Sequence, residues 1–168
     1  MTTEVEIEFS KMVRAAIKAD DVDGVAALLE PQRNLLDAVT PFGTWLHVAA
    51  TAGSLDVTKK LVEMGADIDK CGGTFDAGPL KVAASYGHVE IVRFLLEQGA
   101  MLDLSEPFRN PLFGAIHNGH LAIVKLLIER GLDSSVKYSG EVMKGMDAIA
   151  YAEQQGRFEI AKFLKSLV

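Results

Sequence analysis

The residues of this chain that could take part in chemistry are four histidines, one cysteine and a few paired acidic side chains. His117 and His120 are three residues apart, a spacing that can place two zinc ligands side by side. Gly119 lies between them and starts a turn, so we expect the two rings on different elements. No third ligand candidate accompanies them, and the sequence therefore predicts no metal site.

The sequence also lacks the motifs of common catalytic sites. No Gly-x-Ser-x-Gly elbow, no Gly-x-x-x-x-Gly-Lys phosphate loop and no Gly-x-Gly-x-x-Gly motif occurs in it. Cys71 is the only cysteine, so it can form neither an internal disulfide nor a cysteine-based metal site. The acidic pairs Asp20–Asp21 and Asp67 with Asp69 suit helix caps and turns. We therefore expect no catalytic residue, no cofactor and no enzyme activity.

Charge and hydropathy exclude two classes of partner. The chain has 17 basic and 23 acidic residues, a formal net charge of −6, and its Lys and Arg residues are scattered. Nucleic-acid binders usually show a basic patch or stripe, so DNA, RNA and anionic membranes are not expected partners. No apolar run approaches the roughly 18–20 residues that cross a bilayer, and the acidic start of the chain does not resemble a secretory signal. We expect a cytoplasmic protein.

One phrase recurs five times and defines the elements that position these residues. Within each copy, with small variations, the apolar residues lie at +2, +4, +5, +8 and +9, a helical spacing with a broad apolar face. An alanine-rich stretch before the later copies predicts a second, short helix that packs closely on its neighbours. Glycines 65, 99 and 131 follow three of the copies and can end a helix in the left-handed conformation. The copies begin at Asp20, Gly53, Gly87, Gly119 and Gly156.

The period near 33 residues, the Ala-Ala-x-x-Gly phrase and the closing Gly-Ala-Asp phrase resemble the ankyrin repeat. The resemblance covers residues 8–168 and implies an all-α fold, a repeat solenoid of stacked helix-turn-helix units joined by hairpin loops. Polar residues of the last helix, Arg157, Glu159, Lys162 and Lys165, are expected to cover the end of the core. We expect a single domain over 1–168, with repeats at about 8–40, 41–73, 74–106, 107–142 and 143–168.

The family's Thr-Pro-Leu-His tetrapeptide, which ties the first helix to the connecting hairpin, is degenerate in this chain. Only the copy Thr44–His47 keeps both the threonine and the histidine. His88 and His120 follow the repeat glycines, where the family commonly has histidine, whereas His117 is not a family position. We expect the other turns to be less rigid; their tetrapeptides are Lys11–Arg14, Gly78–Lys81, Asn110–Phe113 and Asp147–Ala150.

The resemblance implies that another protein binds to the hairpin tips and the concave face of the first helices. Phe42, Phe75 and Phe108 are spaced 33 residues apart at the predicted tips, where the family usually has glycine, aspartate or asparagine. The rings are either exposed anchors for a partner or packing groups folded onto neighbouring hairpins, and the sequence leaves both open. The other candidate contact residues near this edge are Trp45, Tyr86, Arg109, His117, Asn118 and Tyr138.

Two further alternatives stay open at this point. Trp45 is either a contact residue or a packing group, and the long connector 131–147 is either a binding loop or a tolerated insertion. The leading hypothesis is a protein-binding module, monomeric when free, that neutralises a toxin or inhibits an enzyme in the manner of an immunity protein. The alternative is a structural or adaptor subunit of a complex.

Overall fold

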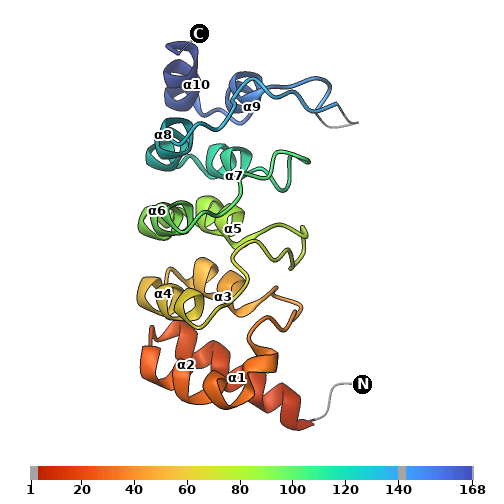
Figure 1. The fold of residues 1–168 in the computed structure, drawn as a ribbon. Helices are drawn as coiled ribbons and strands as arrows, with labels where there is room; N and C mark the ends of the chain where they lie inside the picture. The colour runs from red at the N-terminus through yellow and green to blue at the C-terminus, as the bar shows by residue number, and fades with distance from the viewer. Residues whose placement is uncertain (1–3, 140–142, 168) are drawn as a thin grey trace. The chain divides into compact units, whose positions relative to one another are not determined.

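A computed structural model describes residues 4–139 and 143–167 of the chain. Ten α-helices and one 3₁₀ helix, η1, follow one another in these residues, and the only strand-like features there are isolated bridges in the hairpins. The predicted all-helical repeat fold is therefore confirmed (Figure 1). The elements are α1 (Glu4–Lys18), α2 (Val22–Leu29), η1 (Glu30–Leu35), α3 (Trp45–Ala52), α4 (Leu55–Glu63), α5 (Pro79–Tyr86), α6 (Val89–Glu97), α7 (Pro111–Asn118), α8 (Leu121–Glu129), α9 (Ala148–Gln154) and α10 (Phe158–Lys165).

The chain divides into two compact units, Met1–Pro79 and Leu80–Val168. In the first unit, α1 pairs with α2 and α3 pairs with α4; α1 then lies against α3, and α2 against α4. The apolar faces meet between these pairs, where Ile17, Leu29 and Leu61 are fully buried. Removing such a side chain from water is worth about 1.5–3 kcal/mol, so the stacking of pairs supplies the stability that one pair lacks.

The second unit repeats this arrangement. Helix α7 pairs with α8 and α9 with α10, while α8 lies against both α6 and α10. Ile91, Leu95, Ile116, Ile123 and Leu127 form its centre and are buried. Within each unit, Figure 1 shows the second helices of the pairs on one side and the connecting hairpins on the other.

Left-handed residues end the first helix of each pair. Gly53, Gly87, Gly119 and Gly156 have φ values of 79°, 86°, 82° and 68°, and each is followed two residues later by the next helix. These are the glycines with which the recurring phrase begins, so the phrase starts at the turn between the two helices of a pair. In the first copy Asp20 takes this role at φ 51°, and its Oδ1 accepts a hydrogen bond from the Val57 amide of α4.

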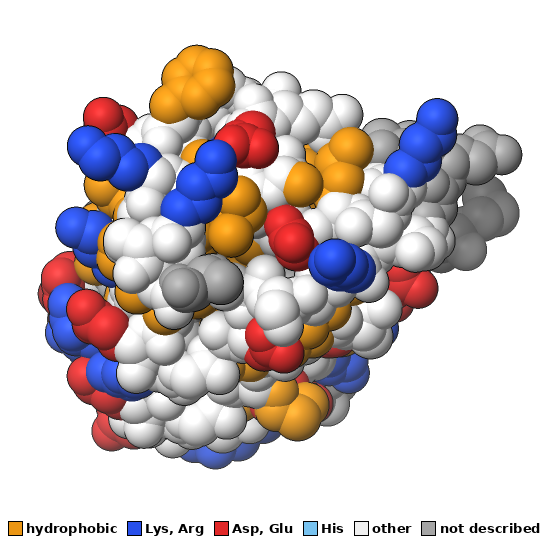
Figure 2. Space-filling view, turned by 90° about the horizontal axis from the view of Figure 1, so that it is seen from above, with side chains coloured by type: hydrophobic (Ala, Val, Ile, Leu, Met, Phe, Trp, Pro, Cys, Tyr) orange, Lys and Arg blue, Asp and Glu red, His pale blue; other side chains and the backbone are white. Residues whose placement is uncertain are grey.

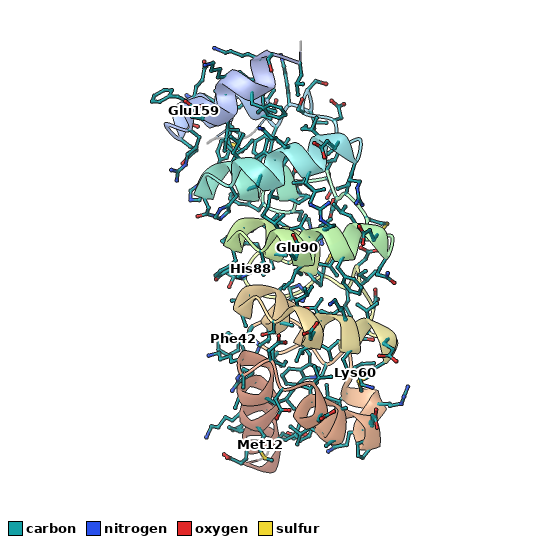
Figure 3. The ribbon with its side chains drawn as sticks, turned by 90° about the vertical axis from the view of Figure 1, so that its left-hand side faces the viewer. Met12, Phe42, Lys60, His88, Glu90 and Glu159 are labelled. Atoms are coloured by element: carbon teal, nitrogen blue, oxygen red, sulfur yellow. The ribbon has the colours of Figure 1, made fainter. Side chains whose placement is uncertain are left out.

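The second helices carry charged side chains on their outer faces. Lys60, Glu90 and Glu159, which are labelled in Figure 3, belong to α4, α6 and α10. Lys60 pairs with Glu30 at 3.4 Å. At the α9–α10 end, Figure 2 shows hydrophobic side chains separated by charged ones. The last repeat therefore has a mixed outer surface in which charged side chains interrupt the apolar ones.

Candidate partner-binding surface

The hairpin that carries Phe42 is a tight turn closed by four hydrogen bonds. Thr40 and Gly43 exchange both backbone bonds at 2.9 Å, and the Thr40 hydroxyl donates to the Gly43 carbonyl and accepts from the Phe42 amide. Gly43 has a φ of 86°, a conformation that a side chain rarely allows. The turn places Phe42 at its tip, where 61% of the residue is exposed (labelled in Figure 3).

The next hairpin presents Phe75 in a similar way. Gly72 and Ala77 form its bridge, and the Gly72 amide donates to the Ala77 carbonyl at 3.2 Å. Gly73 and Asp76 have left-handed φ values of 70° and 46°, which turn the chain on both sides of the tip. Phe75 is 54% exposed.

These two hairpins of the first unit lie against each other through glycine. A Cβ placed on Gly72 would be 3.1 Å from the Gly43 Cα, and one on Gly73 would be 3.7 Å from the Gly43 nitrogen. Val39 adds a third exposed apolar side chain beside them, and its Cγ1 lies 3.6 Å from the Gly72 Cβ position. We call Val39, Phe42 and Phe75 the tip patch.

His47 forms hydrogen bonds to both hairpins and holds them together. Its Nδ1 accepts from the Thr44 amide at 3.1 Å and bonds the Thr44 hydroxyl at 2.8 Å, while its Nε2 lies 2.6 Å from the Ala77 carbonyl. Burial lowers the pKa of His47, although the bond to Ala77 and the charge of Asp76 act in the opposite direction. The ring is therefore neutral at pH 7 and works as a structural connector.

In two other repeats, the position equivalent to His47 holds a different residue type that also contacts the next hairpin. Arg14 stands 33 residues earlier, and its guanidinium lies 5.1 Å from the centre of the Phe42 ring in the following hairpin. Phe113, in the same position of the fourth repeat, meets the Tyr138 ring edge-on at 5.1 Å. This position contacts the next hairpin in all three cases. Sequence reasoning missed Arg14 as a neighbour of Phe42, although its place in the repeat was a usable signal.

In the second unit, Phe108 lies in a turn that the amides of Arg109 and Asn110 close on the Glu106 carbonyl. Phe108 is 59% exposed. Arg109 pairs with Asp103 at 3.7 Å and is partly buried. Burial acts to raise the pKa of Asp103, but hydrogen bonds from Ser105 and the charge of Arg109 outweigh it and lower that pKa. Arg109 is thus held by its own loop.

Two of the candidate contact residues are buried, which for Trp45 favours the packing alternative. Trp45 is only 1% exposed, and its Nε1 donates to the Leu35 carbonyl at 2.9 Å. Tyr138 is also buried; its hydroxyl accepts from Nδ2 of Asn110 and donates to the Leu104 carbonyl, both at 2.9 Å. Both rings pack inside because each has a main-chain carbonyl within reach of its polar group. We therefore remove Trp45 and Tyr138 from the candidate surface.

Tyr138 also fixes the long connector 131–147. It pairs with Met146 as an isolated bridge, and the Gly145 amide donates to its carbonyl at 2.8 Å. Residues 140–142 of this connector lie outside the described residues. The first helices of the fourth and fifth repeats, α7 and α9, have side-chain caps of their own: Asn110 accepts from the Leu112 amide and Asp147 from the Ala150 amide. The degenerate tetrapeptides of these two repeats therefore still cap their helices.

The first-helix candidates of the second unit are exposed. Tyr86 is 58% exposed and stacks on His88, with ring centres 6.5 Å apart. His117 is exposed, and its Nδ1 lies 3.1 Å from the Tyr151 hydroxyl. Asn118 is exposed too, with Nδ2 donating to the Gly114 carbonyl. These three polar or aromatic groups remain available for contact.

Comparison with known proteins identifies the family. Residues 12–106 match the family model described as ankyrin repeats (3 copies), and residues 109–138 match the one described as ankyrin repeat. The chain belongs to the ankyrin repeat family. Ankyrin repeats generally mediate protein–protein interactions and are typically non-catalytic. A search of curated proteins finds no match to the chain.

Two further observations concern other kinds of site in this ankyrin repeat chain. Among residues 4–139 and 143–167, no three His, Cys, Asp or Glu side chains are grouped so that they could hold a metal ion. Within the same ranges, no helix is both long and apolar enough to span a membrane.

Proposed function

We propose that this chain is a non-catalytic protein-binding module whose contact surface includes the hairpin tips. The observation that carries the proposal is the exposure of a phenylalanine at each of three tips, Phe42, Phe75 and Phe108. Exposed aromatic side chains are costly in water and are favoured anchors at interfaces. In the first unit, glycine contacts and His47 hold two of the tips in one arrangement, so little ordering is needed when a partner binds.

The exposed side chains of α5 and α7 extend the proposal to the first helices. Tyr86, His117 and Asn118 of the second unit offer an exposed aromatic face and polar groups. An apolar anchor with surrounding polar groups is the usual composition of a protein interface. The net charge of −6 favours a basic partner surface through long-range attraction.

We further propose that the partner is a toxin or enzyme that the chain inhibits, in the cytoplasm, with the chain monomeric when free. A binding surface without catalytic groups can act on its partner by covering the partner's working surface. Measurement of the partner's activity with and without the chain tests this role. Loss of that activity supports inhibition, and unchanged activity in a stable complex supports an adaptor subunit instead.

Partner capture with matched variants tests the binding surface. The variant F42A/F75A/F108A is compared with the wild type and with Phe158→Ala, which removes an even more exposed phenylalanine, on α10. We expect Phe158→Ala to capture the same protein as the wild type and the triple variant to lose it. Equal capture by all three would refute the proposed surface. Circular dichroism checks that the helical content is unchanged.

A further inference from the structure

The hydrogen bonds of His47 determine which of its ring nitrogens carries the proton. The Ala77 carbonyl, 2.6 Å from Nε2, can only accept, so Nε2 must carry a hydrogen. The Thr44 amide, 3.1 Å from Nδ1, can only donate, so Nδ1 must be unprotonated. The Thr44 hydroxyl donates its own hydrogen to the same Nδ1 at 2.8 Å. The neutral ring therefore satisfies every neighbour on both hairpins.

A second proton on Nδ1 would oppose this arrangement. The Thr44 hydroxyl can rotate and accept from the new N–H, but the Thr44 amide cannot, and two N–H groups would then face each other. Thr44 and His47 are each only 1% exposed, so water cannot replace the lost partner while the hairpins stay closed. The repulsion between the two N–H groups is relieved only when the ring or a hairpin moves away.

The charged surroundings of His47 do not cancel this effect. The 72–77 hairpin contributes Asp76, whose charge favours the protonated ring, but burial outweighs it. The 40–43 hairpin has no titratable side chain, and α3 has none besides His47. Arg14 of α1 lies over the Phe42 ring of the 40–43 hairpin and adds positive charge to this region.

We propose that His47 is a proton-sensitive latch, closed when neutral, which releases the 72–77 hairpin from the 40–44 turn in mild acid. Release separates Phe42 from Phe75 and disperses the tip patch. The effect of acid on partner binding rests on the proposed function, whereas the opening itself does not. The equivalent positions of the other repeats hold no histidine, so the latch is specific to the second repeat; they are Arg14, Lys81, Phe113 and Ala150.

The direction of the pH effect follows from proton linkage. A released His47 has an ordinary pKa of about 6.5, and the latched ring has a lower one. As the pH falls below about 6.5, the released form gains protons that the latched form does not. The opening equilibrium therefore rises by up to about tenfold per pH unit until the pKa of the latched ring is reached.

Nuclear magnetic resonance of the full chain between pH 7.5 and 5 tests the latch without any partner. The imidazole nitrogen shifts report the tautomer and the pKa of His47, and hydrogen exchange of the Thr44 amide reports the opening. We expect the Nε2–H tautomer, a pKa below 6.5, and faster opening at Thr44 as the pH falls. The Leu132 amide, bonded to the Leu127 carbonyl in the second unit, serves as the control and should not follow this trend.

Two variants make the test specific. His47→Gln removes the titration, so the pH dependence of opening at Thr44 should disappear whatever the absolute stability. Asp76→Asn keeps a side chain that tolerates the left-handed φ of 46° and removes the facing charge, so the pKa of His47 should fall further. A His47 pKa at or above 6.5 would overturn the latch. So would protonation of His47 without a rise in the opening equilibrium at Thr44, taken from exchange rates corrected for the intrinsic pH dependence of amide exchange. Because no partner is present, neither result depends on the proposed binding surface.

Discussion

The hydroxyl oxygen of Tyr138 makes two hydrogen bonds between the long connector and other parts of the second unit. Tyr138→Phe removes that oxygen and keeps the ring, which still meets Phe113 edge-on. The change eliminates the hydrogen bonds to Asn110 and to the Leu104 carbonyl, both 2.9 Å long. Burial raises the pKa of Tyr138, so the hydroxyl stays protonated, and both bonds are present at neutral pH.

The expected cost follows from these two bonds. Each contributes about 1 kcal/mol net, and the amide of the fully buried Asn110, left without its partner, adds about 1 kcal/mol. We therefore expect the free energy of unfolding to fall by about 2–3 kcal/mol. For a chain of this size, that loss lowers the melting temperature by about 5–10 °C.

Urea unfolding and calorimetry of matched variants measure this effect. Tyr86→Phe is the control, because Tyr86 is exposed and its hydroxyl removal should change the unfolding free energy by less than about 0.5 kcal/mol. A Tyr138→Phe variant as stable as the control would refute the anchoring role of the hydroxyl. A comparable loss in both variants would show that hydroxyl removal in general, rather than the buried network, is responsible.

Three other predictions concern turns, packing and pH. Gly43→Ala should destabilise the first unit by about 2 kcal/mol or more, because φ is 86° and the new Cβ would lie 2.5 Å from the His47 Cγ. Urea unfolding measures this loss, and a value below about 0.5 kcal/mol would contradict the close approach. Ser85→Ala removes a buried hydroxyl oxygen without a hydrogen-bond partner, so stability measured by thermal melting should be unchanged or rise by up to about 1 kcal/mol, and a clear loss would contradict this. Because the folded pKa of His47 is lowered, its contribution to the free energy of unfolding is fully present above about pH 6.5. That contribution is lost as the pH falls toward the folded pKa, by at most about 1.4 kcal/mol per pH unit. An unfolding free energy with the same pH dependence in the wild type and in His47→Gln would refute this prediction.

The helices and their boundaries could be predicted because each repeat contains the local signals that determine them. The left-handed glycines, such as Gly53 and Gly119, are needed wherever the chain turns between paired helices, so they recur with the fold. The apolar spacing recurs for the same reason, because every pair must bury its face against the next one. These requirements are local and repeated, and a single sequence reveals them.

The burial of individual side chains could not be predicted in the same way. Trp45 and Tyr138 are interior because the carbonyls of Leu35 and Leu104 happen to lie within hydrogen-bond reach, and those partners come from other segments. The surroundings of Phe42 likewise depend on another segment, since the Arg14 guanidinium of α1 lies 5.1 Å from the centre of its ring. Nothing in the local sequence distinguishes a ring with such a partner from one without it.

The caps of the later repeats were predictable in principle. Asn110 and Asp147 stand where the family has threonine, and both residue types are strong helix caps. The degenerate tetrapeptide was interpreted as a weaker turn, but a cap requires only a side-chain oxygen at that position. In the second repeat the histidine hydrogen-bonds both Thr44 of its own turn and the main chain of the next hairpin.

The most direct test of the central claim is the affinity of the captured partner for two variants, measured by titration calorimetry. Burial of the exposed part of a phenylalanine ring, about 100 Å² of surface, is worth about 2.5 kcal/mol. We therefore predict that F42A/F75A/F108A weakens binding at least a hundredfold, whereas Phe158→Ala changes it less than about twofold. Unchanged affinity in the triple variant, or a triple variant that no longer folds, would contradict the claim that these rings are exposed anchors for a partner.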